Sequence, residues 1–167
     1  MERTSYRFDV VCDFGAFRDL QRHRLMSIEW QRLSTRLGFD TPTDIVDAGH
    51  RTVWAEAMDR SRGMYERIRE QHGADVAQYV VPFAANIRFV MEMNARQAYH
   101  LIELRSQPAG HTAYRRVAHE MARLIDEVAA HHAIAAGMEF VDYTDVDLER
   151  LEAERAAERR RAARASG

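Results

Sequence analysis

Three stretches of the chain alternate between apolar and polar residues with a period of two, which predicts β-strands. They run from Tyr6 to Phe14, from Arg24 to Trp30 and from Ile87 to Met93. Alternation of this kind is typical of a strand with one buried face. The residues expected on the buried faces are Phe8, Val10, Cys12 and Phe14, then Met26, Ile28 and Trp30, and then Ile87, Phe89, Met91 and Met93.

Apolar residues recur at helical spacing in most of the remaining chain. Long helices are expected over residues 44–71, 94–105 and 112–136, and short ones over 17–21 and 75–81. Gly15 is expected to end the first strand, Gly73 to close the first long helix, and Asn94 to cap the second. Gly63 interrupts the first long helix, and Pro42 favours a turn over residues 38–42.

Composition changes near the end of the chain. The 167 residues suffice for one domain with a sizeable core, and we expect it to span residues 1–141. Residues 142–167 are expected to form a charged helical tail, because 147–165 consist almost entirely of Glu, Arg, Ala and Leu. A solvated tail is the first interpretation, and a coiled-coil contact is the weaker one.

Charge and cysteine content narrow the range of functions that the protein could have. The formal net charge of −2 argues against a nucleic-acid-binding protein. All 24 basic residues are Arg, which suits anion recognition but also follows from coding bias. The single Cys12 excludes an internal disulfide and fits a cytoplasmic location. No apolar stretch is long enough to span a membrane, and residues 1–4 lack the apolar segment that is expected of a signal peptide.

Common catalytic and metal-binding motifs are not found. The eight histidines include no pair with helical metal-ligand spacing, so no metal site is predicted. Cys12 lies within a predicted strand and has no basic neighbour, which argues against a nucleophile. No Gly-x-Ser-x-Gly turn or Gly-rich phosphate loop appears either. We therefore assign no catalytic residue.

The remaining candidate chemistry is anion binding. The triplet Arg22-His23-Arg24 crowds two guanidinium groups around an imidazole, an arrangement that favours a nearby anion or polar ring. A solvated charge run is the plainer reading of such a triplet. Asn94 and Arg96 open a predicted helix, where backbone amides favour phosphate.

The order of these motifs resembles the flavin-dependent thymidylate synthases. In that family an Arg-His-Arg triplet opens a signature strand, and the later motifs follow in a fixed order. The resemblance covers roughly residues 8–124. The matching motifs are Arg22-His23-Arg24, Val81-Pro82, Arg88, Asn94-Ala95-Arg96 and Leu104-Arg105.

The resemblance implies an α+β fold, an antiparallel sheet with packed helices, in a homotetramer that binds FAD and dUMP between subunits. Reduced flavin would pass a hydride to a methylene taken from methylenetetrahydrofolate, with NADPH as the reductant and dTMP as the product. Arg105 would bind the nucleotide. The residues implied at FAD are Arg22, His23, Arg24, Asn94 and Arg96, with His100 in the place of a second Asn on the helix.

The departures from the family pattern fall mainly on the dUMP side. The family's acidic residue, Ser and Arg align without a gap with Trp30, Arg32 and Ser34. A two-residue insertion would instead bring Ser34 and Arg36 into the Ser-x-Arg place, on the same strand face but displaced by about 6 to 7 Å. Gln78 replaces a dUMP-binding Arg, and Asp19 replaces a Gln.

Three hypotheses follow from these residues. The first is an active FAD-dependent thymidylate synthase-like protein with Arg105, Ser34 and Arg36 on the substrate side. The second is a non-catalytic homologue, or one half of a tandem synthase, that serves assembly or flavin binding only. The third is a structural domain whose arginines only form ion pairs.

Overall fold

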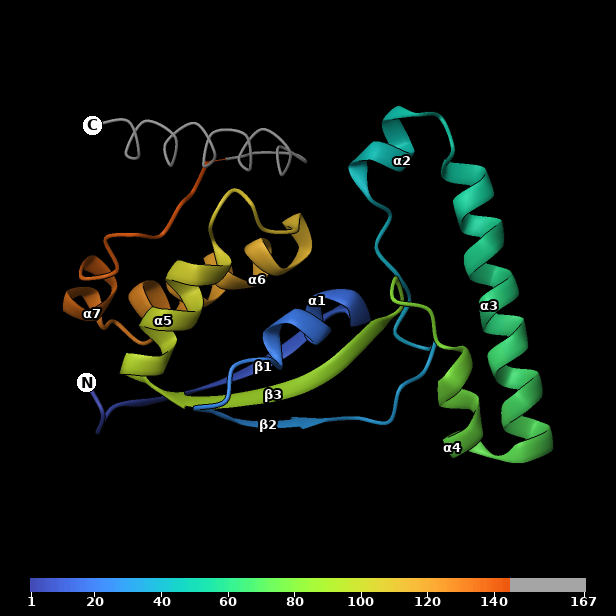
Figure 1. Cartoon of the computed structure of the whole chain (residues 1–167), viewed down its shortest axis with the longest axis horizontal. Coiled ribbons are helices and arrows are strands. Elements are labelled where there is room, and N and C mark those ends of the chain that lie inside the picture. The colour runs from blue at the N-terminus through green and yellow to red at the C-terminus, as the bar shows by residue number, and fades with distance from the viewer. Residues whose placement is uncertain (145–167) are drawn as a thin grey trace, which may run out of the picture. The chain divides into compact units, whose positions relative to one another are not determined.

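The computed structural model describes residues 1–144 of the chain, which form an α+β fold (Figure 1). Two compact units are distinguished: unit 1 comprises residues 1–6 and the chain from Met93 onward, and unit 2 comprises Arg7–Glu92. The expected helix over residues 147–165 lies outside the described part.

In chain order the elements are β1 (Ser5–Asp13), α1 (Phe14–Leu20), β2 (Ser27–Trp30), α2 (Thr43–Asp47), α3 (Arg51–His72), α4 (Ala74–Ala77), the 3₁₀ turn η1 (Gln78–Val80), β3 (Asn86–Asn94), α5 (Ala95–Arg105), α6 (Thr112–Arg123), the π-helical turn η2 (Leu124–Val128) and α7 (His132–Ala136).

The sheet has three strands in the order β1-β3-β2. Strands β2 and β3 are antiparallel, with Ser27 opposite Glu92 and Trp30 opposite Phe89. Strands β1 and β3 are also antiparallel, because the backbone N–H of residue 95 donates to the carbonyl of residue 4 while that of residue 14 donates to residue 85. The expected antiparallel sheet is thus confirmed for the described strands.

Burial along the two long strands follows the predicted alternation. Phe8 and Cys12 of β1 are buried, and all four predicted positions of β3 are buried. The third strand is shorter than predicted, since β2 begins only at Ser27. Trp30 of β2 remains 53% exposed although its ring lies 5.5 Å from that of Phe17.

Gly15 does not end the first strand, contrary to the prediction. Strand β1 stops at Asp13, whose side chain accepts a hydrogen bond from the backbone N–H of Ala16 at 2.8 Å and so caps α1. Gly15 lies in the first turn of this helix. A carboxylate at the N-cap position satisfies an otherwise unpaired helix amide, and this interaction sets the boundary.

The helix expected over residues 44–71 is two helices. Gly49 adopts a φ of 74°, a left-handed conformation that ends α2 before α3 begins at Arg51. Gly63, which was expected to interrupt the helix, lies within α3. Gly73 closes α3 with a φ of 88°, as predicted.

Unit 2 contains a small apolar cluster beside α3. Tyr65 of α3 is buried together with Ala77, Val81 and Ala85, and Leu33, Ile68 and Val80 pack against this group. Helix α4 and η1 lie along the C-terminal half of α3 (Figure 1). The cluster therefore fixes that half of the long helix.

Unit 1 is built on α5 and α6, which pack together (Figure 1). The helix expected over residues 112–136 is wrong as a single element, because α6 passes into the turn η2 and then stops before α7. Ala130 adopts a positive φ of 54° at this break. Within residues 1–144, no helix combines the length and apolarity needed to cross a membrane.

Candidate functional site

The triplet lies in the connection between α1 and β2. Its backbone is anchored to α1, since the N–H of His23 donates to the carbonyl of Leu20 at 3.3 Å. His23 is only 8% exposed, whereas Arg22 and Arg24 are exposed. The imidazole is therefore buried, while the two guanidinium groups remain accessible to an anion.

Arg22 has a nearby carboxylate on α1. Its Nε lies 3.5 Å from Asp19 Oδ1, and 71% of its side chain is exposed. An ion pair that is this long and exposed contributes little to stability. Asp19 occupies the position where the family resemblance expects a Gln, so this departure places a negative charge next to the triplet.

The first turn of α5 holds the second group of predicted cofactor residues. Asn94 caps this helix, because its Oδ1 accepts a hydrogen bond from the backbone N–H of Gln97 at 2.9 Å. Arg96 is exposed, and its Nη1 donates to the carboxylate of Glu2 at 2.8 Å. His100 is exposed one turn further along. The predicted cap at Asn94 is confirmed.

Arg105 is the last residue of α5 and is half-buried. Its guanidinium lies 5.3 Å from the ring centroid of Tyr114, within the range of a cation–π contact. Arg96 and Arg105 are nine positions apart, so about 14 Å of helix separates their backbones. The residues expected at FAD and at the nucleotide thus occupy opposite ends of α5.

A buried arginine that the sequence did not single out supports the end of α5. Arg115 is 3% exposed, and its Nε donates to the carbonyl of Ser106, the residue after Arg105, at 2.8 Å. Its Nη2 donates to the carbonyl of Thr144 at 2.7 Å. Only a three-dimensional arrangement brings these carbonyls to one side chain, because nothing in the sequence relates residues 106, 115 and 144.

Residues 140–144 are held near the end of α5 and along α6 by further polar contacts. Gln107 Nε2 donates to the carbonyl of Phe140 at 2.8 Å, and His119 Nε2 lies 2.7 Å from the carbonyl oxygen of Asp142. The pKa of Asp142 is lowered, chiefly by its hydrogen bond with Thr144 and also by the charge of Arg115. Residues 141–144 are irregular backbone whose path these contacts define.

Ser34 and Arg36 lie in the segment after β2 and contact each other, with the N–H of Arg36 donating to Ser34 Oγ at 3.4 Å. The Arg36 guanidinium is paired with Glu66 of α3, Nε with Oε1 at 3.0 Å and Nη2 with Oε2 at 3.2 Å. Arg69 donates to the same carboxylate at 2.7 Å. Hydrogen bonds from Arg36 and then Arg69 lower the pKa of Glu66 from 4.5 to about 2.

The other departures on the dUMP side also have structural contacts. Gln78 Oε1 accepts a hydrogen bond from the backbone N–H of Leu33 at 3.0 Å. Arg32 pairs with Asp75 at 2.9 Å. Both contacts hold the segment after β2 against α4 and η1, so these positions contribute to the local fold of unit 2.

Arg88, the strand arginine of the motif set, pairs across the sheet with Asp9 of β1. Two of its guanidinium nitrogens, Nε and Nη2, donate to the two carboxylate oxygens of Asp9. The hydrogen bond from Arg88 lowers the pKa of Asp9. Arg88 therefore joins β3 to β1 on the exposed face of the sheet, a contact that the motif alone did not predict.

The predicted site residues divide between the two units. Unit 2 contains the triplet, Ser34 and Arg36, and unit 1 contains Asn94, Arg96, His100 and Arg105. Each set lies within a single unit. Both sets present exposed or half-buried cationic side chains near the end of a helix, and such groups suit phosphate-containing ligands.

Comparison with known proteins gives the class of this domain. Residues 1–130 match the family model described as thymidylate synthase complementing protein. This match covers well over half of the chain, so the protein belongs to that family. The resemblance drawn from the ordered arginine motifs is confirmed at the level of the family.

Individual relatives extend the comparison. A UPF0159 protein of Chlamydia muridarum is 42% identical over 154 residues, and one of Thermoplasma acidophilum is 42% identical over 155 residues; each alignment covers 92% of this chain. The aligned region is only 28% and 30% of those two proteins, so the chain spans less than a third of their length. A flavin-dependent thymidylate synthase of Geobacter sulfurreducens is 29% identical over 138 residues, covering 77% of this chain and 60% of that protein.

Proposed function

We propose that this protein is a flavin-dependent thymidylate synthase-like enzyme that converts dUMP to dTMP. The observation that carries the proposal is the intact Arg22-His23-Arg24 triplet in a member of this family, with both guanidinium groups exposed and the imidazole buried. The proposal includes a homo-oligomer, expected to be a tetramer, and a cytoplasmic location.

The residues present fit FAD. A flavin dinucleotide carries two linked phosphates, and exposed guanidinium groups with weak partners exchange readily onto such an anion. Arg22, Arg24 and Arg96 are exposed, and the first-turn amides of α5 add a favourable dipole. The proposed FAD set is completed by His23, Asn94 and His100. Bound FAD, reduced by NADPH, would supply a hydride to the one-carbon unit from methylenetetrahydrofolate.

On the substrate side, the proposal assigns the nucleotide to Arg105, with Ser34 and Arg36 as further contacts. Tyr114 stacks under the Arg105 guanidinium and Arg115 binds the carbonyl of the next residue, so both restrict where Arg105 can reach. A preorganised arginine loses less conformational entropy when it binds an anion. These residues bind and orient the nucleotide and do not take part in bond making.

The cofactor is tested by flavin uptake. The purified full chain is expected to bind FAD, measured as quenching of flavin fluorescence, and the double variant Arg22→Ala/Arg24→Ala is expected to lose most of this binding. The matched control is Arg60→Ala/Arg67→Ala, which removes two exposed guanidinium groups from α3. Equal FAD affinity in the two double variants would remove the triplet from the cofactor site.

The nucleotide is tested separately with Arg105→Ala. We expect the dissociation constant for dUMP to rise by a factor that corresponds to about 2 kcal/mol, because a charge-assisted contact to the nucleotide is lost. Calorimetric titration measures it. An unchanged constant would contradict the role of Arg105.

A second candidate function is a non-catalytic homologue, or one half of a tandem synthase, that serves assembly or flavin binding only. Two observations favour it: Arg36 and Gln78 are engaged in contacts within unit 2, and the chain spans less than a third of its UPF0159 relatives. Formation of dTMP from dUMP by the purified chain, supplied with FAD, NADPH and methylenetetrahydrofolate, would reject this candidate.

A further inference from the structure

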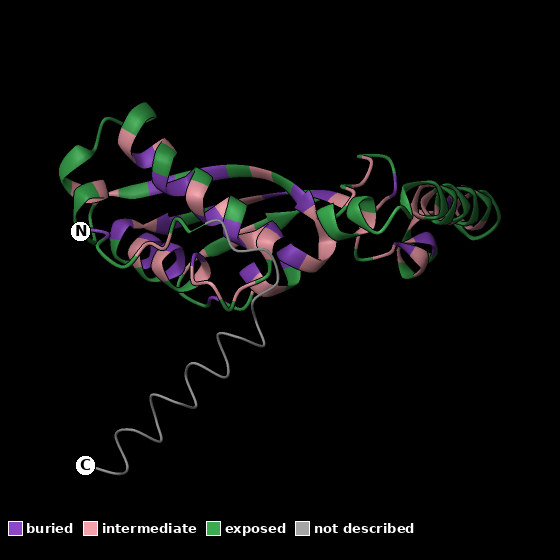
Figure 2. Cartoon of the chain, turned by 90° about the horizontal axis from the view of Figure 1, so that it is seen from above, coloured by how far each residue is buried: buried purple, intermediate pink, exposed green. Residues whose placement is uncertain are grey.

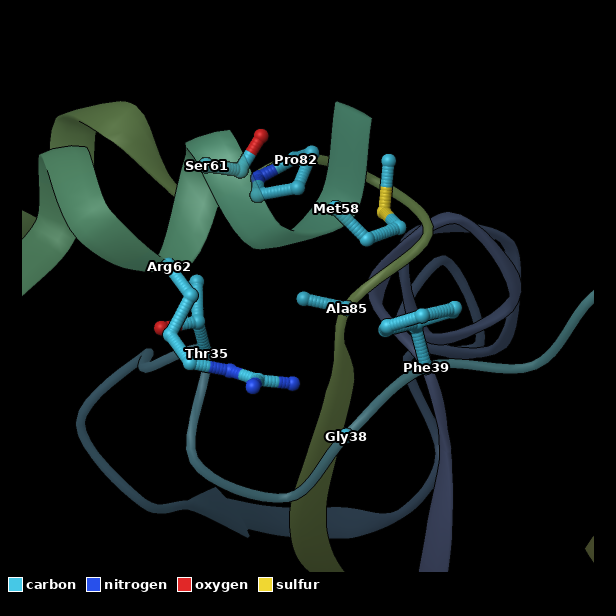
Figure 3. Close-up of a pocket in the computed structure, with 8 residues that line it drawn as sticks. All are labelled: Thr35, Gly38, Phe39, Met58, Ser61, Arg62, Pro82 and Ala85. Atoms are coloured by element: carbon cyan, nitrogen blue, oxygen red, sulfur yellow. The ribbon is translucent and has the colours of Figure 1, made fainter. Parts of the chain in front are cut away.

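The segment after β2 lies against a face of α3 that is rich in arginine. Arg62, Glu66 and Arg69 are spaced four and three positions apart, so they share this face of the helix. Arg36 approaches Glu66 from the segment, and Arg62 lines a small cavity together with Thr35 (Figure 3). Three guanidinium groups and two carboxylates therefore gather in unit 2, since Arg62 also pairs with Asp59 at 3.3 Å.

The Glu66 carboxylate is bound in the way that proteins bind a phosphate. Its two oxygens accept three N–H bonds, two from the planar fork of Arg36 and one from Nε of Arg69, at 2.7 to 3.2 Å. The same fork geometry matches carboxylate and phosphate oxygens alike. These bonds also lower the pKa of Glu66 to about 2, below its ordinary 4.5.

The contact between Arg36 and Glu66 is of a kind that exchanges easily. The two side chains are 55% and 32% exposed, and exposed ion pairs contribute little to stability. Arg69 pairs with the same carboxylate from within α3, and 37% of its side chain is exposed. A phosphate monoester carries a charge of about −1.5 to −2 and three acceptor oxygens, so it competes well with a singly charged carboxylate.

Thr35 gives an independent indication that this segment has another arrangement or ligand. It is only 6% exposed, and its hydroxyl has no hydrogen-bond partner among the residues that the structure describes. A buried hydroxyl without a partner is unfavourable. Thr35 lines the cavity that also contains Arg62, and it lies between Ser34 and Arg36 in the sequence.

We propose that Glu66 is an internal, displaceable anion that occupies a phosphate-monoester site formed by Arg36 and Arg69. Without a ligand, the Glu66 carboxylate occupies the site. A phosphate monoester binds by displacing Glu66 from Arg36. The identity of the monoester as a nucleotide rests on the proposed function; the exchange itself requires only the phosphate group.

The exchange is tested with inorganic phosphate and the full chain, by ³¹P NMR titration. Glu66→Ala and the isosteric Glu66→Gln are expected to bind phosphate about fivefold more tightly than the wild type, because the competing carboxylate is gone. The matched control is Glu70→Ala, which removes an exposed carboxylate from the same helix with the same change in net charge. Equal affinities for both Glu66 variants and the control would overturn the proposal.

A second comparison shows that the gain comes from Arg36. In the background of Glu66→Ala, the further substitution Arg36→Ala is expected to return phosphate affinity to the wild-type level or below. If the double variant keeps the full gain, the phosphate binds elsewhere and the assignment of Arg36 is wrong.

Titrations with dUMP and with deoxyuridine, which has no phosphate, separate this proposal from the proposed function. If Glu66→Ala tightens phosphate binding while dUMP binds no better than phosphate alone, the exchange is supported and the nucleotide assignment fails. If dUMP binds in an Arg105-dependent manner and Glu66→Ala changes neither ligand, the nucleotide assignment is supported and the exchange fails.

Discussion

Helices α5 and α3 show two different ways of holding a functional side chain in place. Helix α5 has 11 residues, of which five are buried: Ala95, Gln97, Ala98, Leu101 and Ile102. Helix α3 has 22 residues, and only Tyr65 is buried (Figure 2). The position of α5 in unit 1 is therefore set by apolar packing, whereas α3 in unit 2 depends on one cluster at its C-terminal half and on surface charges.

Charged pairs occupy much of the surface of α3, where α5 has apolar packing. Glu56 pairs with Arg60 and Asp59 with Arg62 within the helix, and Arg36 pairs with Glu66 from outside it. Surface pairs are weak and sensitive to salt, and they rearrange without a loss of core contacts. Helix α5 is therefore a fixed support for Arg105, while α3 presents the partly exposed carboxylate of Glu66, which we propose an anion displaces.

The largest expected difference between the helices comes from truncating one apolar side chain in each. Leu101 is fully buried in α5, so Leu101→Ala is expected to lower the free energy of unfolding by about 3 kcal/mol. Val53 in α3 is 66% exposed, and Val53→Ala is expected to change it by less than about 0.5 kcal/mol. Urea unfolding measures both. A similar loss in the two variants would mean that α3 is buried against a partner.

The next largest effect concerns Arg115, whose side chain is only 4% exposed. Arg115→Met is expected to lower the free energy of unfolding by about 2 to 3 kcal/mol, because the carbonyls of Ser106 and Thr144 lose their donor. The matched control, Arg67→Met on the exposed surface of α3, is expected to have almost no effect. Equal losses of unfolding free energy in Arg115→Met and Arg67→Met would show that solvent replaces the hydrogen bonds of the buried guanidinium.

A smaller effect, opposite in sign, is expected at Gly63. A Cβ at this position within α3 would meet nothing within 4 Å, so Gly63→Ala is expected to stabilise the protein by about 0.5 to 1 kcal/mol. Gly73 has a φ of 88°, and Gly73→Ala is expected to destabilise it by about 1 kcal/mol. Thermal unfolding of the two variants checks these signs, and destabilisation by Gly63→Ala would place a partner on that face.

The smallest effect is a pH dependence at Glu66. Its pKa in the folded protein is about 2, below the ordinary 4.5, so its contribution to stability is present above pH 4.5 and is lost as the pH falls toward 2. The difference in stability between wild type and Glu66→Gln is therefore expected to shrink between pH 6 and pH 3. Urea unfolding across this range measures it, and a constant difference would show that Glu66 is not held by the two arginines.

The sequence predicted those elements whose pattern is local. Period-two alternation identified β1 and β3, and the amide of Asn94 identified the start of α5. The error at Gly15 was avoidable, because Asp13 carries the ordinary signal of an N-cap. The helix break at Ala130 could not be predicted, since a positive φ at an alanine has no local sequence signature.

The candidate site was predictable only as a set of residue types. The triplet and the arginines of α5 could be found from their order, but their partners could not. Glu66 is 30 positions from Arg36, and Thr144 is 29 from Arg115. Contacts over such distances depend on how the chain folds back, so the sequence did not indicate that Arg36 is paired or that Arg115 is buried.

The capped junctions at Asp13 and Asn94 have a consequence for which changes in chain length this family member tolerates. Each long strand passes directly into a helix, so one inserted residue there would rotate the following side chains by about 100° and turn the triplet or Arg105 away. An insertion between Trp30 and Gly38 would fall in irregular backbone and leave both junctions unchanged, although it would shift the contacts of Leu33 and Arg36. Evolution can lengthen the chain there, in the stretch that contains Ser34 and Arg36, while the two junctions keep their spacing.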